Sequence, residues 1–255
     1  MRIRVRFFVS FVFILLFSCQ PTGKHRTIGS ETILISSENI AEKDPELVDI
    51  IKTYRESLEE DMNRLLAYSA HVMERGTPEG KLNNFVADLV FETGQQLYQP
   101  IDESCIDFCL LNYGGLRVPI PAGEVTYARV FELLPFENEM VVITLTGEKT
   151  KELFEYLANS SVGMPIAGAR FSIKNNSPLN ITIQDQDFDP ERNYKVLTSD
   201  YLAGGGDSMN FFLAPLDYHY LGLRVRDAII QYMHHQHQSG KEISASLDGR
   251  ITIIE

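Results

Sequence analysis

Apolar residues recur along this chain with more than one period, and each period predicts a different kind of element. Asp44 can cap a helix and Pro45 suits its first position, and apolar residues then recur at helical spacing as far as Leu65. This pattern predicts a long amphipathic helix over 44–66. A second helix fits Lys81 to about Tyr98, and shorter helices fit 126–134, 148–159 and 223–238.

Short apolar runs between these helices predict strands. They lie at 67–74, 106–111, 139–146, 169–174, 179–184, 194–198 and 250–254. Strands and helices follow one another without a strict strand-helix-strand rhythm. The order therefore favours an α+β fold, a single domain over 67–255 with a mixed sheet flanked by helices and preceded by the long helix.

The first residues have the pattern of a targeting segment. Three arginines precede an apolar run from Phe7 to Phe17, which is shorter than the roughly 20 residues that a transmembrane helix needs. Residues 16–19, Leu-Phe-Ser-Cys, resemble a bacterial lipobox, so we expect 1–18 to be a lipoprotein signal peptide and Cys19 to be lipidated. The alternative is an ordinary cysteine beside an ordinary signal peptide. With 19–43 as a tether, the sequence predicts an exported, membrane-anchored lipoprotein on the periplasmic or cell-surface side.

Charge and cysteine content exclude some partners and scaffolds. The chain of 255 residues has 23 Lys and Arg against 35 Asp and Glu, a formal net charge of −12, which disfavours binding to a nucleic-acid polymer. Three cysteines do not make a disulfide framework. Cys105 and Cys109 would be about 13 Å apart in a strand, which is too far for a disulfide bridge. Cys109 is interpreted as a core residue.

Three bends beside predicted strands hold the candidate chemistry. The run 106–111 ends in Asn-Tyr-Gly-Gly-Leu-Arg at 112–117, and 133–138 reads Leu-Leu-Pro-Phe-Glu-Asn before the next strand. The third bend, 199–207, contains Tyr201, three glycines and Asp207. Glycines let the backbone approach a ligand closely, and two aromatic rings with Asp, Asn and Arg suit a flat base that carries a sugar and an anion. Alternatively, Phe136 and Tyr201 are both core residues.

On these motifs the chain resembles the C-terminal, substrate-binding domain of the 5′-nucleotidase family, standing alone without the metallophosphatase domain. The family's Asn-Gly-Gly-Gly-Ile-Arg is met by 112–117, its Leu-Pro-Phe-Gly-Asn by 134–138 and its Phe-Leu-Ala-(any)-Gly-Gly-Asp-Gly by 201–208. The resemblance runs from about residue 68 to 255. Tyr113 and Ser208 replace family glycines, and Tyr201 replaces a phenylalanine but keeps an aromatic plate.

The resemblance implies a role for each matching residue. Phe136 and Tyr201 would sandwich the base, Asp207 would hold the ribose, and Arg117 would point to the phosphate. A second basic residue of the family falls on Lys81, although lysine lacks the bidentate fork of arginine. The implied substrate-binding residues are Lys81, Asn112, Gly114, Gly115, Arg117, Phe136, Asn138, Tyr201, Gly205 and Asp207.

The family's metal-binding motifs are missing from this sequence. The resemblance implies a preceding domain in which two divalent metal ions generate the attacking hydroxide, but residues 20–66 are too short for it and no Asn-His dipeptide occurs. The histidines at 234, 235 and 237 are interpreted as solvated or packing residues. We therefore expect no catalytic residue, metal or cofactor in this chain, and hydrolysis of a nucleotide by a separately encoded metallophosphatase. The alternative is a non-catalytic nucleotide- or nucleoside-binding lipoprotein.

Two further patterns leave alternatives open. Residues 76–81 resemble a phosphate-binding loop, but only three residues separate the two glycines where four are needed. The helix over 44–66 either packs on its own domain or offers a docking surface to a partner.

Overall fold

A computed structural model describes residues 44–100 and 104–254. Cys19 and the segments 1–18 and 19–43, expected to be a lipidation site, a signal peptide and a tether, lie outside these described residues. Over the described residues, no helix is long and apolar enough to cross a membrane.

Helix α2 (Pro45–Asn63) confirms the first predicted helix. The Asp44 carboxylate caps it by accepting from the backbone N–H of Glu46 at 2.9 Å. The chain divides into two units, 1–51 and 52–255, and α2 runs from the first into the second. The sheets, the cores and the candidate site all belong to the second unit.

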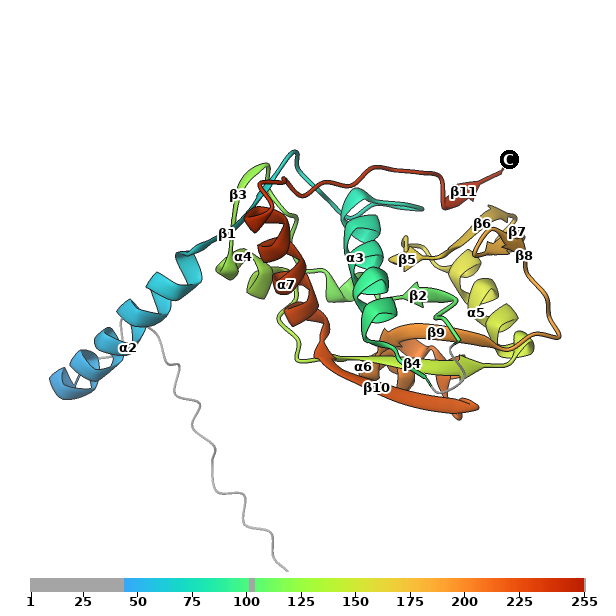
Figure 1. Cartoon of the computed structure of the whole chain (residues 1–255), viewed down its shortest axis with the longest axis horizontal. Coiled ribbons are helices and arrows are strands. Elements are labelled where there is room, and N and C mark those ends of the chain that lie inside the picture. Colours follow the sequence, from blue (N-terminus) through green and yellow to red (C-terminus); the bar gives the residue numbers. More distant parts are fainter. Residues whose placement is uncertain (1–43, 101–103, 255) are drawn as a thin grey trace, which may run out of the picture. The chain divides into compact units, whose positions relative to one another are not determined.

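A five-stranded sheet forms the centre of this unit (Figure 1). Its order is β10 (Asp217–Arg224), β4 (Glu139–Leu145), β9 (Tyr194–Ser199), β2 (Phe108–Leu110) and β5 (Ile166–Ala167). Strand β9 runs parallel to β2 and antiparallel to β4. This sheet is mixed, as the sequence predicts.

Both faces of the inner strands of the central sheet are buried. Alternate residues of β2 and β4, such as Cys109 and Met140, join a core with helices α3 (Lys81–Leu97), α4 (Tyr127–Leu133) and α7 (Val225–Gln238). Their neighbours, such as Phe108 and Val141, join a second core with α5 (Gly147–Asn159) and α6 (Asp200–Ala203). Because successive side chains of a strand point to opposite faces, a strand between two cores is apolar throughout. This explains the continuous apolar runs in the sequence.

The remaining strands form two smaller sheets. One has the order β11 (Ile251–Ile253), β6 (Ala169–Lys174), β7 (Ser177–Ile183) and β8 (Gln186–Asp187). The other pairs β1 (Leu65–Ser69) with β3 (Gly123–Thr126). The α+β class is therefore confirmed, but the strands are distributed over three sheets where one was expected.

A buried arginine ties the C-terminal segment to the rest of the unit. Arg250 donates to both carboxylate oxygens of Asp88 on α3, at 2.6 and 3.0 Å, and to the carbonyl of Ile166 on β5 at 2.8 Å. It also pairs with Asp248, which is held in turn by Arg170 on β6. These bonds place the segment before β11 against both α3 and β6.

Candidate functional site

The topology of the central sheet brings the three candidate bends to one edge. Strands β2 and β9 are parallel, so the bends that follow them leave the sheet at the same end. Strand β4 is antiparallel to β9, with Met140 opposite Ser199, so the bend that precedes β4 enters at that end as well. Segments 112–117, 134–138 and 201–208 thus meet although up to about ninety residues separate them.

Backbone hydrogen bonds connect the bends. The N–H of Arg117 in the first bend donates to the carbonyl of Leu133, next to the second, at 2.8 Å. The N–H of Glu139, after the second bend, donates to Oδ1 of Asp200, next to the third, at 3.1 Å. The second bend is therefore held between the other two, as the order of β2, β9 and β4 also implies.

The first bend is a single turn of 3₁₀ helix, η1 (Tyr113–Gly115). Gly115 is buried, and a Cβ at that position would come within 2.8 Å of Oδ1 of Asn112. The Arg117 guanidinium is exposed and donates to the carbonyl of Gly114 at 3.4 Å. This bend leaves the exposed Gly114 and the Arg117 cation accessible to an anionic ligand.

The second bend presents Phe136 to solvent and is held by hydrogen bonds from Arg226. Nη1 of Arg226 donates to the carbonyls of Leu134 and Phe136, at 3.4 Å each, and Nη2 pairs with Glu137 at 2.5 Å. The hydrogen bond from Arg226 holds the pKa of Glu137 below its usual value. Arg226 is thus a positioning residue for the ring of Phe136, one that the sequence analysis missed.

The third bend brings Tyr201 and Asp207 together. Gly205 has φ +85°, the left-handed conformation that glycine adopts without strain, and the chain turns back there toward Tyr201. The Tyr201 hydroxyl donates to Oδ1 of Asp207 at 2.8 Å. This hydrogen bond raises the pKa of the Tyr201 phenol.

The exposure of the two rings decides between the two interpretations of Phe136 and Tyr201. The relative exposure is 41% for Phe136 and 44% for Tyr201, and neither ring contacts another aromatic ring in the described part of the chain. Burying such rings is favourable, so their exposure at one sheet edge is typical of a binding surface. The interpretation of both as core residues is wrong.

The remaining candidates differ in how they are held. The carbonyl of Asn138 accepts from the N–H of Val225 at 3.0 Å, which joins the second bend to α7, and Asn138 is half-buried. Lys81 begins α3 and is half-buried, and its ammonium group makes no hydrogen bond or ion pair within 44–100 and 104–254. The structure therefore does not connect Lys81 to the bends.

Arg75, which the sequence analysis did not select, does contact the first bend. Its guanidinium lies over the ring of Tyr113 with Cζ 4.4 Å from the centroid, and Nη1 donates to the Tyr113 carbonyl at 3.3 Å. Arg75 is exposed, so with Arg117 it supplies a second cation at this bend. In the same segment Gly76 and Gly80 pack backbone against backbone, and a Cβ on either would come within about 2.2 Å of main-chain atoms. Glycine at both positions therefore allows the backbone at residue 76 to lie against the backbone at residue 80.

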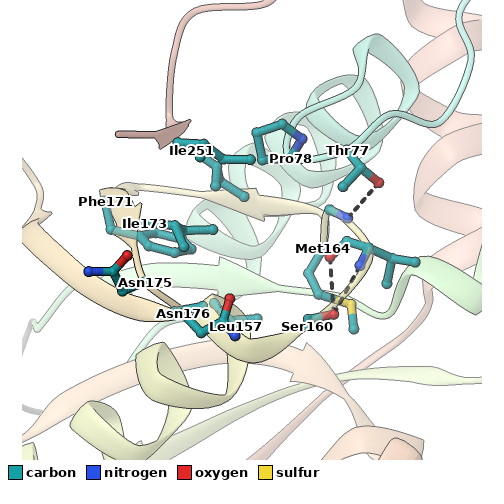
Figure 2. A pocket seen from close by; sticks show the side chains of 14 residues that line it. Thr77, Pro78, Leu157, Ser160, Met164, Phe171, Ile173, Asn175, Asn176 and Ile251 are labelled. Atoms are coloured by element: carbon teal, nitrogen blue, oxygen red, sulfur yellow. Dashed lines mark hydrogen bonds between the residues drawn. The ribbon is translucent and has the colours of Figure 1, made fainter. Parts of the chain in front are cut away.

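A separate hollow of ≈ 180 Å³ lies between the end of α5, the β6–β7 turn and β11 (Figure 2). Its walls are mainly apolar, with the amides of Asn175 and Asn176 at one side. None of the ten implied substrate-binding residues lines it. The hollow is therefore distinct from the surface that the bends form.

Among the described residues, His219 and His237 pack against tyrosines, whereas His234 and His235 are exposed. The His237 ring lies 5.9 Å from Tyr68, and the His219 ring packs edge-on at 5.3 Å from Tyr98. Cys109 is buried in β2 and Cys105 is exposed, and both are free. No group of three or more His, Cys, Asp or Glu side chains within the described ranges could hold a metal ion.

This arrangement defines a class of protein: an α+β domain that presents two exposed rings, a carboxylate and an arginine at the end of its central sheet. The sequence model described as "5′-nucleotidase, C-terminal domain" matches residues 62–214. The chain belongs to this family. Strand β10, helix α7 and strand β11 follow the matched stretch.

Individual relatives agree with this assignment. An apyrase of Tabanus yao is 23% identical over 235 residues, 83% of this chain and 42% of the apyrase. A 5′-nucleotidase of Vibrio vulnificus (strain CMCP6) is 28% identical over 186 residues, 70% of this chain and 32% of the relative. The crystal structure of a 5′-nucleotidase precursor from Thermus thermophilus has the same fold, with a TM-score of 0.68 and 21% identity over 82% of this chain and 43% of that one. The chain thus spans less than half the length of each.

Proposed function

We propose that this chain is the substrate-recognition half of a split 5′-nucleotidase-type phosphohydrolase that acts in nucleotide catabolism. It binds a nucleotide at the bends and presents the phosphate to a separately encoded metallophosphatase. The observation that carries the proposal is the convergence of 112–117, 134–138 and 201–208 at one sheet edge with Phe136 and Tyr201 exposed.

The chemistry of each side chain supports a ligand with a base, a sugar and a phosphate. Exposed rings provide stacking of about 1–3 kcal/mol per base. The Asp207 carboxylate can accept from sugar hydroxyls, and the amides of Asn112 and Asn138 can bond the base or the sugar. Arg117 and Arg75, at the first bend, supply the cations that a phosphate needs.

Hydrolysis would require metal ions that a partner supplies. In a two-metal site the ions activate the attacking water and clamp the phosphoryl group. The chain spans 42% or less of the apyrase and the 5′-nucleotidase to which it is similar. In this proposal two divalent ions belong to that partner. We further propose that a lipid on Cys19, after removal of 1–18, holds the chain at the membrane.

Phosphate release from AMP tests whether this chain binds the nucleotide and a separate metallophosphatase hydrolyses it. We expect none from the purified chain with Mn²⁺ or Zn²⁺, and release when a metallophosphatase encoded in a neighbouring reading frame is added. Activity of the chain alone would contradict the proposal. Binding of AMP with no stimulated hydrolysis would instead support a nucleotide-binding lipoprotein without catalysis.

A further inference from the structure

Two tyrosine hydroxyls hold Asp207 at three of its polar groups. The Tyr201 hydroxyl donates to Oδ1 at 2.8 Å and accepts from the Asp207 backbone N–H at 3.2 Å. The Tyr156 hydroxyl, from α5, donates to the Asp207 carbonyl at 2.9 Å. Oδ2 of Asp207 makes no hydrogen bond within the part of the chain that the structure describes.

The backbone conformation around Asp207 allows the Tyr201 hydroxyl to reach the carboxylate. Asp207 and Ser208 have φ of 52° and 62°, a left-handed conformation that is unfavourable for residues other than glycine unless their surroundings hold them in it. A Cβ on Gly206 would come within 2.5 Å of the Tyr201 ring, so only glycine lets the ring lie against the turn. The hydroxyl of Tyr201 reaches Asp207 because of this close approach.

We propose that Tyr201 is a positioning residue for sugar recognition: its hydroxyl fixes the Asp207 carboxylate so that Oδ2 accepts from one hydroxyl of the ligand's ribose. This inference rests on the proposed function, in which Asp207 meets the sugar. The ring and the hydroxyl of Tyr201 then have separate tasks, since the ring stacks on the base and the hydroxyl orients the acceptor.

A fixed carboxylate with one open oxygen recognises one hydroxyl better than two. A freely rotating carboxylate can accept from both hydroxyls of a cis-diol, one at each oxygen. Here the Tyr201 hydroxyl occupies one acceptor position of Oδ1, whereas both positions of Oδ2 are open in the part of the chain that the structure describes. The site is therefore expected to discriminate between 2′-deoxy-AMP and 3′-deoxy-AMP, with one of them binding nearly as well as AMP.

Calorimetric titration of the full chain and its Tyr201→Phe variant tests the inference. Phenylalanine keeps the stacking ring and removes only the hydroxyl. We expect the affinity for AMP to fall about five- to tenfold, the loss typical of one hydrogen bond, while 2′,3′-dideoxy-AMP changes less than about twofold. Tyr156→Phe is the matched control, because it removes a bond to the carbonyl and leaves the carboxylate held.

The outcomes separate this inference from the proposed function. No AMP binding by the wild-type chain would contradict the proposed function and the inference with it. Normal AMP binding, with an equal loss for AMP and dideoxy-AMP in Tyr201→Phe, would overturn the inference alone. A gain in AMP affinity would overturn it too, because the hydroxyl would then compete with the sugar for Asp207.

Discussion

Replacing Arg226 with methionine is expected to lower both the stability of the chain and its affinity for a nucleotide. Arg226 is 4% exposed, and its charged hydrogen bonds to two carbonyls and Glu137 hold the bend that carries Phe136. Methionine fills much of the volume but leaves the two carbonyls without this donor and Glu137 with Arg224 alone. We expect a loss of about 2 kcal/mol in the free energy of unfolding, measured with urea. AMP affinity should fall roughly tenfold as the stacking ring loses its position.

Arg224→Met is the matched control. Arg224 pairs with the same carboxylate of Glu137 at 3.1 Å, but its side chain is 47% exposed. An exposed pair contributes at most about 1 kcal/mol. Equal effects of the two substitutions would show that Arg226 does not position the bend.

The second large effect is expected for Arg250→Met. Arg250 is buried and bonds Asp88, Asp248 and the Ile166 carbonyl, so its removal takes this donor from Asp88 and from the carbonyl and leaves Asp248 with Arg170. Losing the charged hydrogen bonds of this buried guanidinium is expected to cost about 3 kcal/mol. The control is Arg170→Met, which removes a 46% exposed partner of the same Asp248 and should cost less than about 1 kcal/mol. Similar costs in urea denaturation would contradict the role of Arg250 as the tie between α3 and the C-terminal segment.

The same cluster predicts a pH dependence of stability. Burial alone would raise the pKa of Asp248, but the hydrogen bond and charge of Arg250, with Arg170, hold that pKa at about 2. A carboxyl whose pKa is lower in the folded state stabilises the fold above the ordinary pKa near 4 and loses this contribution as the pH falls toward 2. We therefore expect wild-type stability to decline between about pH 4 and pH 2, and to decline less steeply in Arg250→Met. If stability fell equally steeply with pH in the wild type and in Arg250→Met, Arg250 would not be the cause of the lowered pKa of Asp248.

The elements with a regular apolar pattern were predictable from sequence. Strand β6 has the predicted bounds, and α5 begins one residue earlier than expected and ends where predicted. Strand β10 was missed because it is an edge strand whose residues are mostly exposed, so Asp217–Arg224 shows no clean alternation. Strands β5 and β8 have two residues each, too few for any period.

The site was predictable where it consists of loop motifs and not where distant residues support it. The three bends were found from glycine, proline and aromatic residues, and their meeting follows from the strand order. Arg226 lies in the first turn of α7, where an arginine in sequence resembles a solvated surface charge. Its burial against Phe131, with Cζ 4.3 Å from the ring centroid, depends on packing between α7 and α4. Arg75 was not selected for the same reason, since only the fold shows that its cation lies on Tyr113.

Titration of AMP into the wild-type chain and its Phe136→Ala variant, followed by calorimetry, tests the central claim most directly. We predict 1:1 binding by the wild type and a loss of about 1–3 kcal/mol in the variant, because one of the two stacking rings is removed. Tyr68→Ala, which removes an exposed ring from β1, should bind as the wild type does. An AMP affinity that is the same in Phe136→Ala and in the wild type, or the absence of binding by both, would contradict a nucleotide site at these bends.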